Sequence, residues 1–557
     1  MKRTRSIGTL AAVLAAASLW GSSAQAQVSE ARIRELVQQA GQSAPPAVVE
    51  ELRQGVTTAL TLDDAVAFAL DRNLDIAVQR LNPQLQDISI ASAQTFYHPT
   101  LTSTLGQTSN SNAPTSQLQL SSGGAGVTNT TFTYNGGLTQ NMPRWGGTLQ
   151  ATLNNSRQAT NSNNAFFNPQ FQSVWTAVFT QPLLRDFRTD AQRRQLQVSR
   201  INRDISDVQL RASVTNIVSN VRNAYWDYVY TTQAVEVARQ SLDLASKLVQ
   251  DNQIRVEVGT MAPIDVVQAQ AEQATRRQGL VNAESARRTS ELALKRLIVG
   301  GTEDANWSAT LDPVDRPEFR PEPPVDVEAA VRRALSQRTD LEIARKNIQT
   351  NNLTLSFLRN QTLPTVDLQV NYGVQGVGGP FLRRSNTGVL GSSITETVPG
   401  GLADALTSLF NASYPRWSAQ VNVSYPIGLS SQDAAVARGR VQLNQVEAQL
   451  RQIELQIATD ITNASIQVRN TSEAVQAAQA ARELSQRRLE AEQSKFEVGM
   501  STNYFVVQAQ RDLNDARNSE LRAVLNYRKA LVELERLQET TLQSSNVTII
   551  QAGGGGF

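Results

Sequence analysis

The sequence has no cysteine and a single histidine, His98, among its 557 residues. The absence of cysteine excludes disulfides, thiolate metal sites and iron–sulfur clusters. His98 precedes Pro99 and has no second histidine or thiolate with which it could share a metal. We therefore interpret His98 as structural. We expect no catalytic site, no cofactor and no metal, so the sequence does not predict an enzyme.

Long apolar runs are also scarce, and the clearest one lies at the N-terminus. Residues 1–26 combine a basic start, an apolar stretch of about 14 residues and the tripeptide Ala24-Gln25-Ala26. This order is typical of a secretory signal peptide that is cleaved after Ala26. A membrane anchor is the less favoured interpretation, because a spanning helix needs about 20 apolar residues. No later run approaches about 18 apolar residues, so the sequence predicts no transmembrane helix.

An excess of charge of either sign is absent once the signal is removed. Lys and Arg number 52 and Asp and Glu number 50, which gives a formal charge of +2. Three basic residues lie in the first five positions, so the mature chain has 49 basic against 50 acidic residues and a charge of −1. Nucleic-acid binding needs clustered positive charge, and we expect no nucleic-acid partner.

The rest of the chain is a tandem duplication. Residues 65–101 align with 330–366 at a constant offset of 265. Further on, Val258-Gly259 recurs as Val498-Gly499 at an offset of 240. Between the copies lies a proline-rich segment that we interpret as an extended connector. The predicted divisions are an N-terminal extension at 27–60, a first repeat at 61–300, the connector at 301–325, a second repeat at 326–542 and a C-terminal tail at 543–557.

Each repeat contains a very long helical pattern without proline. In the second repeat it runs from about Asp433 to Glu497, with apolar residues mostly three and four positions apart. In the first repeat it runs from about Leu184 to Glu257. About 65 residues at 1.5 Å per residue give roughly 100 Å, far longer than an ordinary globular helix.

The long helix of the second repeat has three distinct sides. Besides its main apolar seam it carries a second apolar stripe, which consists of Val441, Ala448 and Leu455. A third side is polar and uncharged, and consists of Gln445, Gln449, Gln452, Gln456, Asn463, Gln467 and Asn470. This pattern suits a helix that contacts two neighbours and faces water on another side. A solid coiled-coil rod, with the glutamines as plain solvent surface, is the alternative.

The long helices end at Val258-Gly259-Thr260 and at Val498-Gly499-Met500. Glycine there can adopt the left-handed conformation that ends a helix. Apolar periodicity restarts within a few residues, so we predict that the chain reverses and that the returning helices reach about Val299 and Gln538. Two further helices are predicted at 62–96 and 328–362.

The segments that join these helices are rich in Ser, Thr, Asn and Gly, and their apolar residues alternate. The clearest runs from Trp417 to Tyr425, with aromatic residues at both ends. Nine residues match a tilted transmembrane strand, although a half-buried strand of a soluble sheet also alternates. The other alternating segments are 101–106, 131–140, 149–153, 175–179 and 366–372.

The number of membrane strands must be even in each repeat, because the flanking helices lie on one side of the membrane. The second repeat has two, near 365–373 and 416–427, joined by a glycine-rich loop at 374–415. The first repeat has two or four strands within 98–181. A turn signal at 142–147 favours four.

With this order of helices, strands and turns, the chain resembles the TolC family of outer-membrane efflux proteins. The resemblance covers Thr61 to about Leu542. It rests on the duplication, the two Val-Gly turns, the segment Thr61-Leu62-x-x-Ala65-Val66-x-x-Ala69-Leu70-x-x-Asn73 and the segment Gln181-Pro182-Leu183-Leu184. It implies a mainly α fold with transmembrane β structure. A tandem-duplicated, long-helix α-barrel in the periplasm would be fused to a β-barrel in the cell outer membrane that a homotrimer shares. Four strands in the first repeat would give 18 in the trimer, against the usual 12.

The resemblance also implies a function and partners. The chain would be the exit duct of a tripartite efflux or type I secretion system and would conduct substrates passively to the outside. Its partners would be a periplasmic membrane-fusion adaptor, an inner-membrane pump and outer-membrane lipid. A non-conducting, periplasm-spanning coiled-coil protein is the alternative.

Site residues follow from the resemblance position by position. The periplasmic tip and adaptor docking surface would be Val258, Gly259, Thr260, Val498, Gly499 and Met500. The entrance constriction would be Asp265, Phe505 and Gln508, and the last two replace aspartates of TolC-like members, so an acidic ring is missing. The tunnel lining would be Gln445, Gln449, Gln452, Gln456, Asn463 and Gln467. The membrane girdle would be Trp417, Tyr425, Trp175 and Tyr372.

Two features concern the chain ends and membrane attachment. Many members of the family carry a lipidated N-terminal cysteine, and a chain without cysteine should lack such an anchor. The C-terminal Phe557 is either an outer-membrane assembly signal or the end of a glycine-rich tail.

Overall fold

The computed structural model describes residues 57–113, 126–162, 164–316, 319–321, 323, 325–384, 394–428 and 430–544. The predicted signal peptide, most of the N-terminal extension, nearly all of the C-terminal tail and Phe557 lie outside these ranges. The described residues belong to two compact units, Met1–Ala59 with Gly301–Asp312, and Leu60–Gly300 with Pro313–Phe557.

The smaller unit contains part of the predicted connector. Its elements are most of β1 (Thr57–Leu60), α7 (Ala305–Ser308) and most of β6 (Thr310–Pro313), and β1 pairs with β6. The connector is therefore not extended throughout. The larger unit holds both repeats, so the two copies of the duplication share one unit and do not fold as separate domains.

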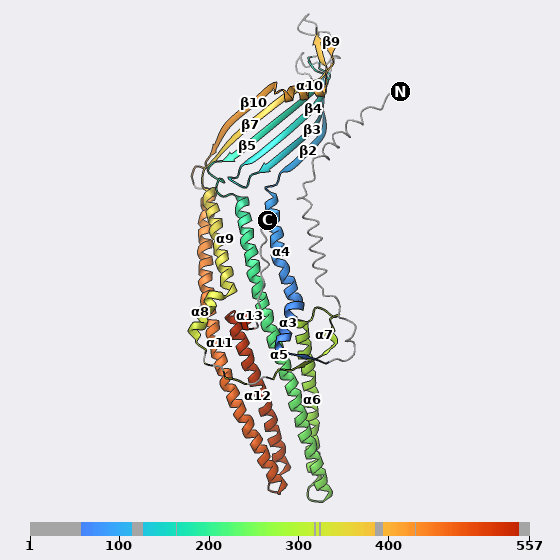
Figure 1. Ribbon diagram of the computed structural model, residues 1–557, viewed down its shortest axis with the longest axis vertical. Helices are drawn as coiled ribbons and strands as arrows, with labels where there is room; N and C mark the ends of the chain where they lie inside the picture. Colours follow the sequence, from blue (N-terminus) through green and yellow to red (C-terminus); the bar gives the residue numbers. More distant parts are fainter. Residues whose placement is uncertain are drawn as a thin grey trace, which may run out of the picture. The chain divides into compact units, whose positions relative to one another are not determined.

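Two helices of 67 residues dominate the larger unit, α5 (Ala191–Glu257) and α11 (Ser431–Glu497) (Figure 1). The predicted start of α5 near Leu184 is wrong by seven residues. Asp186 has a φ of 63°, which no helix allows, and the Asp190 side chain accepts a hydrogen bond from the backbone N–H of Arg193 as the N-cap. Ser430 forms a capping box with Asp433 at the start of α11.

Each long helix is paired with a returning helix. The returning helices are α6 (Pro263–Ile298) and α12 (Asn503–Leu537), and each packs along the long helix that precedes it. Their ends lie within one residue of the predicted ones. Proline occupies the first position of α6, where its missing N–H costs nothing.

The two shorter predicted helices are each divided in two. The first becomes α3 (Leu62–Arg72) and α4 (Leu74–Thr95), and the second becomes α8 (Val327–Gln337) and α9 (Thr339–Gln361). Asn73 is extended between α3 and α4, and its side chain accepts hydrogen bonds from the backbone N–H groups of Asp75 and Ile76. An asparagine favours such a cap over a helix interior, which explains the break.

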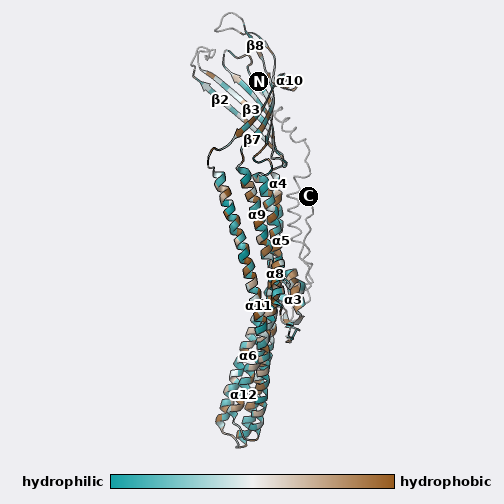
Figure 2. Cartoon of the chain, turned by 90° about the vertical axis from the view of Figure 1, so that its left-hand side faces the viewer, coloured by the Kyte–Doolittle hydropathy of each residue, from teal (hydrophilic) through white to brown (hydrophobic). Residues whose placement is uncertain are grey.

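The helices pack in an order that leaves two open sides. α5 contacts α4 and α6, and it also contacts α9 and α12, which in turn contact α11. In the single chain, α4 and α6 are therefore the outer members on one side of the array, and α11 is the outer member on the other. The helices carry hydrophilic and hydrophobic residues next to one another along their length, as Figure 2 shows. Among the helices of the described ranges, none has an apolar stretch long enough to cross a bilayer.

Six strands form one antiparallel sheet. They are β2 (Thr100–Asn112), β3 (Val127–Asn141), β4 (Thr148–Thr160), β5 (Gln170–Pro182), β7 (Thr365–Gly378) and β10 (Tyr414–Ser424). Their order is β10-β7-β5-β4-β3-β2, so the two repeats join between β5 and β7 (Figure 1). Four strands come from the first repeat, which confirms the larger of the two predicted numbers. β2 and β10 are the edges of the sheet.

The segment predicted as a glycine-rich loop at 374–415 contains regular structure. β7 continues to Gly378, and β8 (Phe381–Arg384), β9 (Ile394–Val398) and the short helix α10 (Leu402–Phe410) follow. α10 packs on β7 and β5. A Cβ added at Gly376 would lie 1.9 Å from the carbonyl oxygen of Ala405, so glycine there allows the helix to approach the sheet. The last described element is α13 (Thr541–Ser544).

Candidate functional site: the helical hairpin tips and the sheet

Both helical hairpins turn through the same hydrogen-bonded motif. Gly259 and Gly499 have φ values of 81° and 79°. The N–H of Thr260 donates to the carbonyl of Arg255 at 2.8 Å, and the N–H of Met500 donates to the carbonyl of Lys495 at 2.8 Å. These bonds, with those of the two glycine N–H groups, form the Schellman motif. The predicted turns are confirmed in place and in mechanism.

The tips present apolar side chains to solvent in the single chain. Val258 is 72% exposed, Val498 is 71% exposed and Met500 is 80% exposed. Exposed apolar side chains at corresponding positions of two repeats are typical of an interaction surface. The role of these residues in adaptor docking stays a prediction.

Behind the tips the two hairpins share a core. Its buried members are Leu248, Val249, Ala269, Leu489, Phe496, Val506, Ala509 and Leu513. The Arg255 guanidinium lies 4.4 Å from the ring centroid of Phe496 and donates to its carbonyl at 3.3 Å. The buried amide of Asn252 donates to the side-chain oxygen of Asn503 at 3.1 Å. The tips are therefore joined to each other within one chain.

The three predicted constriction residues lie on α6 and α12, and no hydrogen bond or ion pair joins their side chains in the described part of the chain. The carbonyl of Asp265 accepts a bond from the Asn503 side chain at 3.3 Å. Phe505 is exposed and packs edge to face with Tyr504. Gln508 donates to Oδ1 of Asp512 at 2.8 Å.

Asp512 is a carboxylate that the sequence analysis missed. It lies one helical turn beyond Gln508, on the same side of α12, and accepts a hydrogen bond from Arg488 of α11 at 2.9 Å. The i, i+4 spacing from Gln508 was the available signal. An acidic group is therefore present near the predicted entrance, one turn deeper than the positions taken from the resemblance.

A buried carboxylate joins the two hairpins further from the tips. Glu272 of α6 is 2% exposed and accepts hydrogen bonds from Arg276 of the same helix and Arg511 of α12. Burial raises the pKa of Glu272, but the hydrogen bonds and charges of the two arginines outweigh it, and the net pKa is lowered. The hydrogen bond that Arg511 donates to Glu272 in turn raises the pKa of Arg511. The spacing of Glu272 and Arg276 is visible in the sequence, whereas the contact with Arg511 is not.

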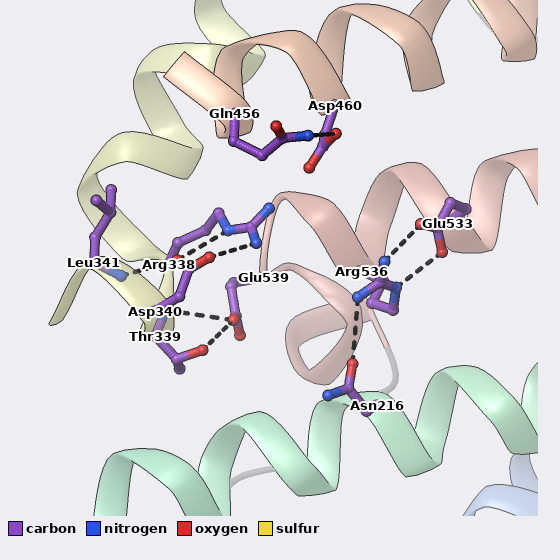
Figure 3. Close-up of polar contacts among 10 residues, drawn as sticks. All are labelled: Asn216, Arg338, Thr339, Asp340, Leu341, Gln456, Asp460, Glu533, Arg536 and Glu539. Carbon is purple, nitrogen blue, oxygen red and sulfur yellow. Dashed lines mark hydrogen bonds and ion pairs between the residues drawn. The ribbon is translucent and has the colours of Figure 1, made fainter. Parts of the chain in front are cut away.

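All six predicted tunnel-lining residues of α11 are exposed in the single chain. The polar stripe is not wholly uncharged, however, because Asp460 falls on the same side of α11. Gln456 donates to Oδ1 of Asp460 at 2.7 Å (Figure 3). Asp460, Asn463 and Gln467 line a shared groove with Glu533 and Arg536 of α12. The prediction that this side of α11 is uncharged is therefore wrong at Asp460.

A polar cluster surrounds the end of α12 (Figure 3). Arg536 forms a bidentate pair with Glu533 at 2.6 and 2.8 Å and donates to the side chain of Asn216 on α5 at 3.3 Å. The hydrogen bond with Glu533 raises the pKa of Arg536. Nearby, the Thr339 hydroxyl donates to Glu539 at 2.8 Å, next to the break between α8 and α9. The cluster joins the end of α12, in the second repeat, to α5 of the first repeat and to the break between α8 and α9.

At the level of Trp417 and Tyr372, the sheet has one apolar and one polar face. Residues that are Cα partners in neighbouring strands share a face. One row across all six strands consists of Leu101, Leu138, Ala151, Ala177, Tyr372 and Trp417. The next row lies on the opposite face and consists of Thr102, Gly137, Thr152, Thr176, Gly373 and Arg416. At this level, the alternation predicted for single segments therefore extends in register across all six strands.

Three of the four predicted girdle aromatics come together on the apolar face. Trp417 and Tyr372 are direct cross-strand partners, and the Trp175 ring lies 6.0 Å from that of Tyr372 in an edge arrangement. Each is seven residues from the end of its strand nearest the long helices. Tyr425 directly follows the helix-side end of β10. Three of these aromatic residues therefore lie at one level of the sheet and Tyr425 lies just beyond its helix-side end, while their role as a membrane girdle stays a prediction.

Comparison with known proteins identifies one matching protein family. A family model described as outer membrane efflux protein matches residues 139–300 and 330–538, one segment in each repeat. No curated protein sequence matches the chain.

Solved structures share the fold. The Campylobacter jejuni CmeC outer membrane channel is 13% identical with a TM-score of 0.60, and the alignment covers 88% of this chain and 90% of that one. The outer membrane protein VceC of Vibrio cholerae is 14% identical with a TM-score of 0.58, with 86% and 95% covered. The open-state MtrE channel of Neisseria gonorrhoeae is 16% identical with a TM-score of 0.59, with 86% and 89% covered.

The family match covers well over half of the chain, and the fold agrees with it. Duplication, glycine-ended hairpins and a strand-rich segment in each repeat are all present. The chain belongs to the outer membrane efflux protein family, the TolC-type outer-membrane channels, whose members are not enzymes.

Proposed function

We propose that three copies of this chain form a continuous duct, with a closed β-barrel in the outer membrane and a hollow α-barrel in the periplasm. The duct conducts substrates passively as the exit component of a tripartite efflux or type I secretion system. The observation that carries the proposal is that both the sheet and the helical array of the described single chain end on two sides without a neighbour.

The open sides of the sheet are the strands β2 and β10. Each has one row of backbone N–H and C=O groups without a strand partner in the described chain, which natural proteins seldom leave exposed. Pairing β10 of one copy with β2 of the next satisfies both rows. Three copies then contribute 18 strands to one barrel.

The helical layer is open at α4 and α6 on one side and at α11 on the other, and α4 and α11 carry exposed apolar seams. The seam of α4 consists of Leu74, Val78, Leu81, Leu85 and Ile88, at steps of four and three. The seam of α11 includes Val441, Leu455, Ile466 and Leu484. Two different surfaces at opposite sides of one chain suit a head-to-tail ring, in which α4 and α6 of one copy pack on α11 of the next.

The remaining surfaces then take distinct roles. The apolar face of the sheet meets outer-membrane lipid, with Trp175, Tyr372, Trp417 and Tyr425 as its girdle. The polar stripe of α11 lines the tunnel. The tip residues dock a periplasmic adaptor that connects the duct to an inner-membrane pump, and Asp265, Phe505 and Gln508 lie at the entrance.

Conductance of purified protein in a planar lipid bilayer tests the proposal. We expect discrete current steps, larger for variants with loosened tips at Gly259 and Gly499 than for the unmodified chain. Absence of conductance from all of these proteins would instead support the alternative, a periplasm-spanning coiled-coil protein without a pore.

A further inference from the structure

A groove with three arginines lies between the first turns of α5 and the last turns of α9. Among its lining residues are Arg188, Thr189, Arg193, Gln197, Arg200 and Ser356. Its polar groups are guanidiniums, hydroxyls and an amide, and no acidic side chain lines it. This composition suits an anion with several oxygen atoms.

The positive charge of the groove is not neutralised within the described chain. Arg193 is paired with Asp190 at 2.7 Å. Arg188 and Arg200 are exposed, and neither forms an ion pair with any described residue. Two guanidiniums therefore remain available to a ligand.

The groove lies next to the sheet along the chain. β5 ends at Pro182, and Arg188 follows six residues later. Arg200 is the tenth residue of α5, about 15 Å from the start of that helix. Cα–Cβ bonds tilt toward the N-terminus of a helix, so the arginines of α5 extend toward the sheet.

The groove and the uncharged polar side of α5 lie on opposite sides of that helix. Gln195, Asn202, Gln209 and Asn216 recur every seven residues and are exposed. At 100° per residue, this row lies roughly 160° from Arg193 and Arg200. If the uncharged side faces the tunnel, as on α11, the arginine groove faces away from it.

We propose that this groove binds the phosphate of an anionic phospholipid in the leaflet nearest the helices. The inference rests on the proposed function, because that function places the sheet in the membrane and the groove at its periplasmic boundary. The headgroup zone on each side of the hydrocarbon core is only about 5–8 Å thick, which guanidiniums on long side chains can bridge. Arg188 and Arg200 hold the phosphate oxygens, while Thr189 and Ser356 donate from their hydroxyls.

The second repeat supplies a matched control. Arg440 is the tenth residue of α11, as Arg200 is of α5, and the two positions are 240 residues apart. Arg440 is exposed and forms no ion pair with any described residue, but it does not line the groove. Its replacement removes a charge at the same helical level.

The experiment measures lipid binding to the purified, detergent-solubilised protein by native mass spectrometry. Phosphatidylglycerol is titrated into the unmodified chain, the R188Q/R200Q variant and the R440Q variant. Phosphatidylcholine and inorganic phosphate serve as further probes. We expect R188Q/R200Q to bind phosphatidylglycerol about 10-fold or more weakly, because the variant loses both unpaired guanidiniums that would donate charge-assisted hydrogen bonds to the phosphate. R440Q should bind as the unmodified chain does.

Equal binding by the unmodified chain and R188Q/R200Q, or an equal loss in R440Q, would overturn the inference. Equal binding of phosphatidylcholine would remove the preference for an anionic lipid, and displacement by inorganic phosphate at matched concentration would identify a free anion as the ligand. Planar-bilayer conductance of the same preparations separates this test from the proposed function. If the protein conducts but shows no lipid selectivity, only the lipid-binding inference fails. If the protein does not conduct, the proposed duct fails.

Discussion

Arg511 of α12 donates two hydrogen bonds, at 3.0 and 2.5 Å, to one carboxylate oxygen of Glu272 on α6. The two residues are 239 positions apart in the sequence and belong to different repeats. Because Glu272 is almost completely buried, its charge depends on Arg511 and Arg276 for compensation. The contact is therefore a direct link between the two hairpins below their tips.

Replacing Arg511 with Gln should destabilise the packing of the two hairpins by about 1.5–3 kcal/mol, the usual contribution of a hydrogen bond to a charged group. Thermal unfolding followed by circular dichroism measures the change. Arg487, which pairs with Glu483 on the exposed surface of α11, is the control, and R487Q should shift stability by less than about 0.5 kcal/mol. An equal loss of thermal stability in R511Q and R487Q would show that the Glu272–Arg511 contact stabilises the fold no more than a surface ion pair does.

The same link predicts a pH dependence. The folded-state pKa of Glu272 is below its ordinary value of 4.5, so its stabilising contribution is complete above that value and is lost as the pH falls through the folded pKa. The difference in melting temperature between the unmodified chain and E272Q should be constant near neutral pH and should shrink below about pH 4.5. A difference that grows on acidification would contradict the assignment.

The sequence predicted the parts of this fold that depend on local periodicity. The long helices, the returning helices and the Val-Gly turns follow from apolar spacing and from the left-handed preference of glycine, and their bounds agree closely except at the start of α5. The break at Asn73 was missed because the helical pattern continues on both sides of it. The Glu272–Arg511 contact was missed because no spacing rule reports which residues of two separate hairpins meet.

In the sheet region too, the sequence predicted local patterns but not the contacts between segments that are far apart in the chain. Alternation predicted individual strands, since each has one apolar face. The helix α10 was missed because nine residues within a glycine-rich segment give a weak periodic signal, and its position depends on a contact with Gly376 that only the packed structure contains. Asp460 was overlooked in the stripe because the glutamines around it dominated the pattern.

Gly376 gives a prediction about α10. In G376A the added methyl group would lie 1.9 Å from the carbonyl oxygen of Ala405, so the helix must move away from the sheet. Hydrogen–deuterium exchange of residues 402–410 should rise, because the packing of α10 on β7 is lost. Gly136 in β3 has open space around its Cβ position, and G136A should leave exchange in α10 unchanged. Unchanged exchange in G376A would show that α10 does not depend on this approach.

The tip glycines give a prediction about adaptor docking. Nothing lies within 4 Å of a Cβ added at Gly259 or Gly499, so any strain comes from the positive φ alone. Alanine should cost about 1–2 kcal/mol at each turn and valine more, because β-branched residues resist that conformation. Crosslinking to the adaptor should fall while the trimer persists.

Gly279, in the interior of α6, is the control for these variants. It also has open space around its Cβ position but no positive φ, so G279A should stabilise the helix by about 0.5–1 kcal/mol. If adaptor crosslinking is as strong in G259V and G499V as in G279A, the turns are not the docking surface.

Leu81 tests the proposed contact between copies. It lies in the exposed apolar seam of α4, away from the buried contacts of its own chain. In L81D each interface of the ring would bury a carboxylate without a partner, which costs several kcal/mol per copy. Size-exclusion chromatography with light scattering should then report monomers whose circular dichroism is unchanged. L81M keeps the side chain apolar and close in volume, so it should assemble normally. A trimer in L81D at the same protein concentration would mean that copies do not associate through α4, and the ring arrangement would have to be abandoned.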